Sequence, residues 1–364
     1  MGKRSITCCA SLLAIVVTTG ASAQVETAPA EQSAGSADQV AEIIVTAQRR
    51  EQNLQDVPAS VTAFDSASLE AQSVLNLTDL NSKVPNVVLA PVGAYPYASA
   101  FFIRGLGFAD VESTFEPSVG VEMNGVYLAR NSGALQDFFD IESVEILRGP
   151  QGTLYGRNTI GGVVSVRTKR PGDSFAGEGQ LTFGDRGRVE ARAALESPLG
   201  DTLAVRASML YKTYNGYNHN ATTEEKVGGN EVWSGRLTLV ARPSDSLEAT
   251  LVADFDRERG TGAAFRNASL PGDVYYDFSP DTGTPTPAVP AGNSDPTDPY
   301  TIYSDTPLFA DLDTWGLAFS LDWAIGGAKI TAVTGYREFK DRVQSDYDAS
   351  ALPFFSALRD QKHE

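Results

Sequence analysis

Beyond Pro171 the sequence consists of runs of about ten residues in which apolar and polar side chains alternate, with turn residues between the runs. Successive side chains of a strand point to opposite faces, so this pattern predicts strands with one apolar and one polar face. Repetition of such runs is typical of transmembrane barrels. About seven runs are present, near 177–184, 187–196, 202–212, 231–241, 246–256, 314–323 and 328–338.

The connections between these runs differ in length in an ordered way. Residues 197–200, 242–245 and 325–328 are short turns, whereas 214–230 and 257–312 are long and polar. Membrane barrels have short periplasmic turns and longer external loops, which predicts that the short turns share one end. The short connection at 184–187 is the exception on the loop side. A soluble β-sandwich is the alternative architecture.

The N-terminus has the features of a secretory signal. Lys3 and Arg4 precede an apolar stretch at 11–17, and small residues end at Ala23. We therefore expect a signal peptide at 1–23 and, because 24–41 lacks large apolar side chains, a disordered tether there. Both cysteines, Cys8 and Cys9, fall inside the signal, which excludes a disulfide or thiolate site in the exported chain.

The charge balance narrows the choice of partners. The chain has 29 basic and 46 acidic residues, a net charge of −17. Nucleic acid is therefore not expected as a partner. A solvated extracellular surface accounts for this charge, and attraction of cationic ligands is the alternative.

Residues 51–171 mix short helical and strand patterns over a length that suits one compact α+β domain. Residues 67–72 and 77–81 are predicted helical turns, with Ser66 and Asn76 as their N-caps. Strands are predicted at 119–127, 141–147 and 162–168. Glycines near 105–107, 149–156 and 161–162 indicate tight turns and lack the setting of a phosphate-binding loop.

Four motifs in this region resemble the TonB-dependent outer-membrane receptors. Residues 42–50, Glu-Ile-Ile-Val-Thr-Ala-Gln-Arg-Arg, are similar to the family's TonB box. Residues 144–156, Val-Glu-Ile-Leu-Arg-Gly-Pro-Gln-Gly-Thr-Leu-Tyr-Gly, are similar to the signature of its plug domain. Ile103-Arg104-Gly105 and residues 117–127 extend the likeness, which covers most of 42–171 and becomes one of pattern beyond it.

The resemblance implies a fold: an α+β plug domain followed by antiparallel strands of a transmembrane β-barrel, which has 22 strands in the full-length family. A plug of about 120 residues is roughly 35 Å across, so seven strands cannot enclose it. Twenty-two strands would need over about 450 residues, yet only 190 follow residue 174. We therefore expect the barrel strands from 175 to 364 to be incomplete and the chain to be truncated.

The resemblance also implies a partner at residues 42–50. The box in this family pairs with TonB, which the inner-membrane energising complex drives, and β-prone residues suit addition to another protein's sheet edge. The predicted TonB-binding residues are Glu42, Ile43, Ile44, Val45, Thr46 and Ala47. The alternative is that these residues form the first strand of the plug.

Other site residues follow from the same likeness. Arg104, Glu145 and Arg148 match family positions between plug and barrel wall, although an ordinary surface strand and turn would also explain them. Tyr95, Tyr97, Phe108 and Phe115 are candidate ligand contacts in apical loops, or packed residues. Only His219 and His363 could supply imidazole after the signal, so no metal site and no cofactor are predicted.

The sequence thus predicts a non-enzymatic outer-membrane receptor that imports a scarce solute by a TonB-driven mechanism. The expected partners are TonB, outer-membrane lipid and a small-molecule chelate, with an iron–siderophore complex favoured over cobalamin or an oligosaccharide. A non-transporting remnant or a soluble plug-like binding protein is the alternative. An exported hydrolase is a third, for which no catalytic constellation is visible.

Overall fold

The computed structural model describes residues 44–46, 49–50, 52–93, 95–109, 116–130, 139–266, 298–351, 353 and 355–363. All of them belong to one compact unit, Glu42–Glu364. The predicted signal and tether, together with Glu42, Ile43, Ala47 and Phe115, lie outside the described residues. No helix within the described ranges is long and apolar enough to cross a membrane.

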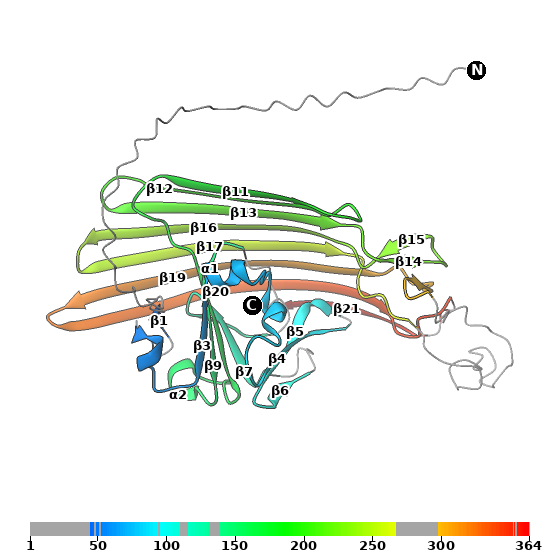
Figure 1. The fold of residues 1–364 in the computed structure, drawn as a ribbon, viewed down its shortest axis with the longest axis horizontal. Coiled ribbons are helices and arrows are strands. Elements are labelled where there is room, and N and C mark those ends of the chain that lie inside the picture. Colours follow the sequence, from blue (N-terminus) through cyan, green and yellow to red (C-terminus); the bar gives the residue numbers. More distant parts are fainter. Residues whose placement is uncertain are drawn as a thin grey trace, which may run out of the picture. The chain divides into compact units, whose positions relative to one another are not determined.

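The N-terminal domain is an α+β unit built on a five-stranded sheet with the order β3-β9-β10-β7-β8 (Figure 1). Strands β10 and β7 are parallel, and the other neighbours are antiparallel. The strands of this sheet are β3 (Val61–Asp65), β7 (Val119–Met123), β8 (Val126–Leu128), β9 (Ile141–Arg148) and β10 (Gly162–Thr168).

Two further small sheets and a few helical turns complete the domain. One sheet pairs β1 (Ile44–Val45) with β2 (Gln52–Asn53), and the other has the order β4-β5-β6. The remaining elements are η1 (Leu54–Asp56), α1 (Ser66–Ala71), η2 (Leu77–Leu80), β4 (Val87–Val92), β5 (Tyr95–Ile103), β6 (Leu106–Phe108) and α2 (Gly152–Tyr155).

The helical turns begin where polar side chains satisfy free backbone amides. Asn76 caps η2 as predicted, in a capping box with Asp79. The predicted cap Ser66 is wrong by one residue, because Asp65 is the N-cap of α1 and its carboxylate accepts the amide of Ser68 at 2.8 Å.

Apolar side chains from both sheets and from the helical turns form the main core of this domain. Leu77, Leu80, Leu89, Ile103 and Ile146 are all 1% exposed or less. Burial of this kind supplies the main stabilisation of such a domain. The domain therefore has its own core, independent of the strands that follow.

The second part of the chain is an eight-stranded sheet in which sequence neighbours pair antiparallel (Figure 1). Its strands are β11 (Ala176–Phe183), β12 (Val189–Pro198), β13 (Leu203–Tyr214), β16 (Asn230–Ser244), β17 (Leu247–Gly260), β19 (Phe309–Ile325), β20 (Ala328–Asp346) and β21 (Ser356–His363). Seven of them correspond to the predicted runs. β21 was missed because Ser356-Ala-Leu-Arg-Asp-Gln-Lys-His363 has no apolar alternation.

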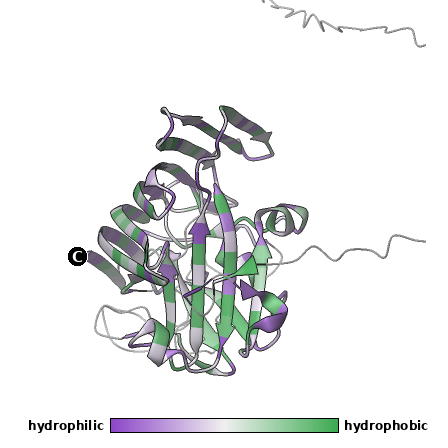
Figure 2. Ribbon diagram, turned by 90° about the vertical axis from the view of Figure 1, so that its left-hand side faces the viewer, coloured by the Kyte–Doolittle hydropathy of each residue, from purple (hydrophilic) through white to green (hydrophobic). Residues whose placement is uncertain are grey.

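Alternation along these strands gives the sheet two unlike faces. Met209 and Trp315 are 45% and 43% exposed, whereas the residues that precede them, Ser208 and Thr314, are 7% and 4% exposed. Figure 2 shows hydrophobic and hydrophilic residues alternating along the strands. The apolar face is suited to lipid, and the polar face carries the groups that meet the N-terminal domain.

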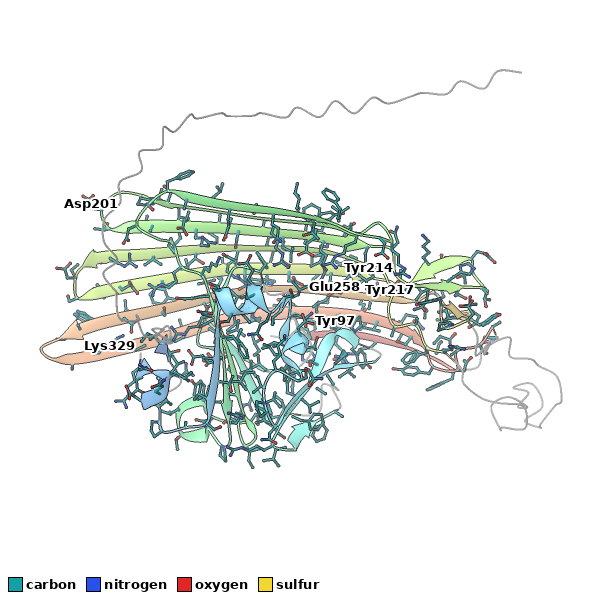
Figure 3. All side chains as sticks on the ribbon, in the orientation of Figure 1. Tyr97, Asp201, Tyr214, Tyr217, Glu258 and Lys329 are labelled. Atoms are coloured by element: carbon teal, nitrogen blue, oxygen red, sulfur yellow. The ribbon has the colours of Figure 1, made fainter. Side chains whose placement is uncertain are left out.

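The two ends of the large sheet also differ. Short turns join β12 to β13, β16 to β17 and β19 to β20 at one end, where Figure 3 labels Asp201 and Lys329. The opposite end carries the third small sheet, made of β14 (Asn218–Asn220), β15 (Glu225–Val227) and β18 (Thr301–Ile302). This small sheet occupies part of the predicted long loops, and β1 lies toward the end with the short turns (Figure 1).

Candidate functional site: the docked N-terminal segment and the contact between domain and sheet

The N-terminal segment around β1 is docked on the domain. Ile44 and Val45 pair with Asn53 and Gln52 in an antiparallel ladder. Ile44 is 53% exposed, but Val45 is fully buried in a small apolar cluster that includes Val57, Leu147 and Val163. In this state Ile44–Val45 is a short strand of the domain, and the binding of residues 42–47 to TonB stays a prediction.

Two buried carboxylates receive the donors of this segment. The amide and hydroxyl of Thr46 both donate to Oε1 of Glu145, at 2.8 and 3.0 Å. The guanidinium of Arg49 donates to Oε2 of Glu122 at 2.8 Å and lies over the ring of Tyr155, 4.4 Å from its centroid. The backbone amide of Thr46 is therefore hydrogen-bonded within the domain.

The two carboxylates that receive this segment are buried. Glu145 is 2% exposed and Glu122 is 6% exposed. Burial raises the pKa of Glu145 above its ordinary value, and the two hydrogen bonds from Thr46 oppose that shift without cancelling it. Burial likewise raises the pKa of the Tyr155 hydroxyl. The hydrogen bonds from Thr46 therefore favour the ionised form of the buried Glu145.

The three residues predicted between plug and barrel make their described contacts inside the domain. Glu145 binds Thr46, and the guanidinium of Arg148 donates to the carbonyl of Pro85 at 3.2 Å. Arg104 has a φ of 55° at a tight turn, and its guanidinium covers Gly149 so closely that an added Cβ would lie 3.1 Å from it. Their role at a barrel wall stays a prediction.

Other residues join the domain to the polar face of the large sheet. Arg206 of β13 donates to the carboxylate of Asp140 at 2.8 Å from Nε, and it also pairs with Glu196 and Glu178. The guanidinium of Arg236 donates to the carbonyl of Phe139 at 3.2 Å. The sequence signal for this contact was the presence of arginines on the polar face of predicted strands. It did not indicate which residues they bind.

A second contact joins β5 to β19, β20 and β21. Tyr97 and Ala98 pack with Leu312, Phe339 and neighbouring apolar residues of the large sheet. Tyr97, which is labelled in Figure 3, is 1% exposed, and its hydroxyl donates to Asp341 at 3.1 Å. The guanidinium of Arg359 lies over the ring of Tyr95, 4.4 Å from its centroid.

The candidate ligand residues are therefore in unlike surroundings. Tyr97 is enclosed, Tyr95 is partly buried under Arg359, and Phe108 on β6 is 37% exposed. Their contact with a ligand stays a prediction, as does that of Phe115. Within the described part of the chain, no cluster of three or more His, Cys, Asp or Glu residues could hold a metal ion.

Sequence comparison matches the N-terminal domain to known proteins. The model of the TonB-dependent receptor plug domain matches residues 53–163. The pesticin receptor of Yersinia pestis is 30% identical over 171 residues, which cover 46% of this chain and 25% of that protein. The vitamin B12 transporter BtuB of Vibrio vulnificus is 32% identical over 126 residues, covering 35% of this chain and 20% of that protein.

A solved structure extends the likeness of fold into the large sheet. The ferric yersiniabactin uptake receptor FyuA from Yersinia pestis superposes with a TM-score of 0.62 at 21% identity, over 79% of this chain and 42% of that one. The matched part of the chain spans no more than a quarter of the length of the two curated relatives. Those relatives are a receptor and a transporter, not enzymes.

Proposed function

The chain belongs to the TonB-dependent receptors of the outer membrane, and from this premise we propose that it serves to import a scarce solute driven by TonB. We further propose that residues 51–171 are its plug, within which the plug-domain model matches 53–163, and that the eight-stranded sheet belongs to its barrel. The solute that we propose is an iron–siderophore complex.

One observation carries this proposal: a separately folded plug is held to the polar face of a sheet whose other face is apolar. Its described contacts with the sheet combine ion pairs, as between Asp140 and Arg206, with an apolar cluster around Tyr97. Polar groups that separate can bond to water instead, whereas separated apolar side chains lose their burial. The arrangement supports a plug that is held in place yet can be displaced.

Energy from TonB would enter through the segment around β1. Ile44 and Val45 are β-prone, and an extended segment can add itself to an exposed sheet edge of another protein. In Figure 1 this segment lies toward the end with the short turns, which is the periplasmic end in such barrels. That position supports capture from the periplasm.

A ligand would enter from the opposite end. The proposed contacts are Phe108 and Tyr95, because they retain exposed or partly exposed rings, with Tyr97 and Phe115 as further candidates. Aromatic rings suit flat or organic chelates. Likeness of fold to the ferric yersiniabactin uptake receptor supports the choice of an iron chelate.

Cobalamin is the second candidate solute, since the vitamin B12 transporter is among the similar proteins. A strain that lacks the complete gene would be tested for growth on single ferric chelates under iron limitation, and separately on cobalamin. We expect the strain to lose growth on at least one ferric chelate and to regain it when the gene is restored. Growth unchanged on every chelate, with cobalamin uptake lost, would overturn the choice of solute.

A further inference from the structure

Two acidic side chains lie in one row across the plug sheet. Ser165 of β10 pairs directly with Glu145 of β9 on one side and with Glu122 of β7 on the other. Residues directly opposite each other on neighbouring strands share a face, so both carboxylates project from the same side of the sheet. The hydroxyl of Ser165 donates to Oε1 of Glu122 at 2.7 Å and fixes that carboxylate.

The spacing of this row matches the segment that covers it. β9 and β7 are two strand spacings apart, or about 9.6 Å. The amide of Arg49 donates to the carbonyl of Thr46 at 2.8 Å, closing a turn that keeps the two Cα atoms within about 7 Å. The long side chain of Arg49 spans the remainder, so Thr46 reaches Glu145 while Arg49 reaches Glu122.

The docked segment supplies the donors that these buried carboxylates need. Oε1 of Glu145 accepts both bonds from Thr46, while Oε2 has no hydrogen-bond partner among the described residues. Departure of the segment would leave Glu145 without either donor and would leave Glu122 with Ser165. The loss of donors from a buried carboxylate is costly, so both side chains favour the docked state: Glu145 would lose Thr46 and Glu122 would lose Arg49.

We propose that Glu122 and Glu145 form a two-carboxylate seat that holds the TonB-box segment on the plug and competes with TonB for it. The seat sets how often the segment is free in the absence of solute. This inference rests on the proposed function for its TonB arm. Its second arm, the exposure of the segment itself, does not need TonB.

The first test measures how exposed the segment is in the ligand-free receptor produced from its complete gene. Val45→Cys places a thiol at a fully buried position of a chain whose own cysteines both fall in the predicted signal. We expect thiol labelling to become about tenfold faster when Glu145→Gln and Glu122→Gln are added together, since each removes a charged acceptor. Arg49→Gln should act in the same direction from the segment side without altering the core.

The second test measures binding of the purified periplasmic domain of TonB to the same ligand-free proteins, without Val45→Cys. We expect about tenfold tighter binding for the double Gln variant, because less of the receptor is held in the docked state. Glu116→Gln is the matched control, since its carboxylate pairs with Arg157 on the plug surface away from the seat. It should change neither labelling nor binding.

The outcomes separate the two proposals. Labelling and TonB affinity that stay at parental values in the double variant and in Arg49→Gln would overturn the seat. Faster labelling in a receptor that never binds TonB would support the seat and overturn the proposed function. Hydrogen exchange of β9 and β10 at parental rates confirms that each variant is folded, and Arg49→Gln decides the matter if the double variant is not.

Discussion

The plug takes part in two contacts that differ in kind: it holds the N-terminal segment around β1, and it meets the large sheet. At the end near β1, a two-residue strand contributes one buried side chain, Val45, and a few polar bonds. On the side of the large sheet, contacts come from several strands, including the enclosed Tyr97 and the ion pair of Arg206 with Asp140. A short, mostly polar attachment is suited to release, whereas a broad contact is suited to retention.

The largest effect should come from breaking the strand at the releasable end. Ile44→Pro removes the backbone N–H of a residue that is 53% exposed, so packing changes little while strand pairing is lost. We expect uptake to fall to the level of a strain without TonB, with ligand binding at the cell surface unchanged. Ile44→Val is the control, because valine keeps the β preference. Uptake at the parental rate in Ile44→Pro would contradict the assignment.

The next effect tests the retaining side. Arg206→Met leaves the buried carboxylate of Asp140 without its ion pair and should destabilise plug attachment by about 4 kcal/mol. Faster hydrogen exchange in the plug strands of the complete receptor would report it. Arg157→Met, which removes an exposed pair with Glu116, should cost less than about 1 kcal/mol. Equal effects of both changes would remove the contrast between the two kinds of attachment.

A smaller effect is expected at the tyrosine contact. Tyr97→Phe keeps the ring in its apolar cluster but takes the hydroxyl from Asp341, a fully buried carboxylate. The loss of one donor should cost about 2 kcal/mol. The same exchange measurement should show faster opening of β5. If ligand affinity fell while hydrogen exchange in β5 stayed slow, Tyr97 would be a ligand contact and not a residue that holds the plug to the sheet.

Sequence alone predicted the elements better than their contacts. Alternation in the run from Leu203 to Tyr211 fixed which side chains face outward, because strand geometry allows only two faces. The helical turn that begins at Leu77 and its N-cap Asn76 could likewise be predicted from local sequence. The polar strand β21 escaped because its register comes from pairing with β20 and not from its own pattern.

Contacts between distant segments could not be predicted in this way. The motif around Glu145 did not indicate that this residue binds Thr46, which is 99 positions away in the sequence. Asp140 was not predicted as a site residue, although it forms an ion pair with Arg206 of the large sheet. Partners of this kind depend on how the separate sheets pack, and a motif carries no information on that geometry.

The smallest expected effect is a pH dependence at the releasable end. Burial raises the pKa of Glu145 above its ordinary value of 4.5, so the folded plug holds this proton more tightly than the unfolded chain does. The charged and titratable groups that face it are Arg49 of the segment, Glu122 of β7, Arg167 of β10 and Tyr155 of α2. Burial and Glu122 raise the pKa, whereas Thr46 and Arg167 lower it.

The sign of the effect follows from that raised pKa. The contribution of Glu145 to stability is fully present below pH 4.5 and is lost as the pH rises through the folded pKa. Glu145→Gln is neutral throughout, so the stability of this variant relative to the parent should increase over the same interval. Urea unfolding of the plug, followed by hydrogen exchange at several pH values, measures this difference. A difference that stays constant with pH would mean that Glu145 titrates as an exposed acid, and the donors of Thr46 would then have no buried charge to satisfy.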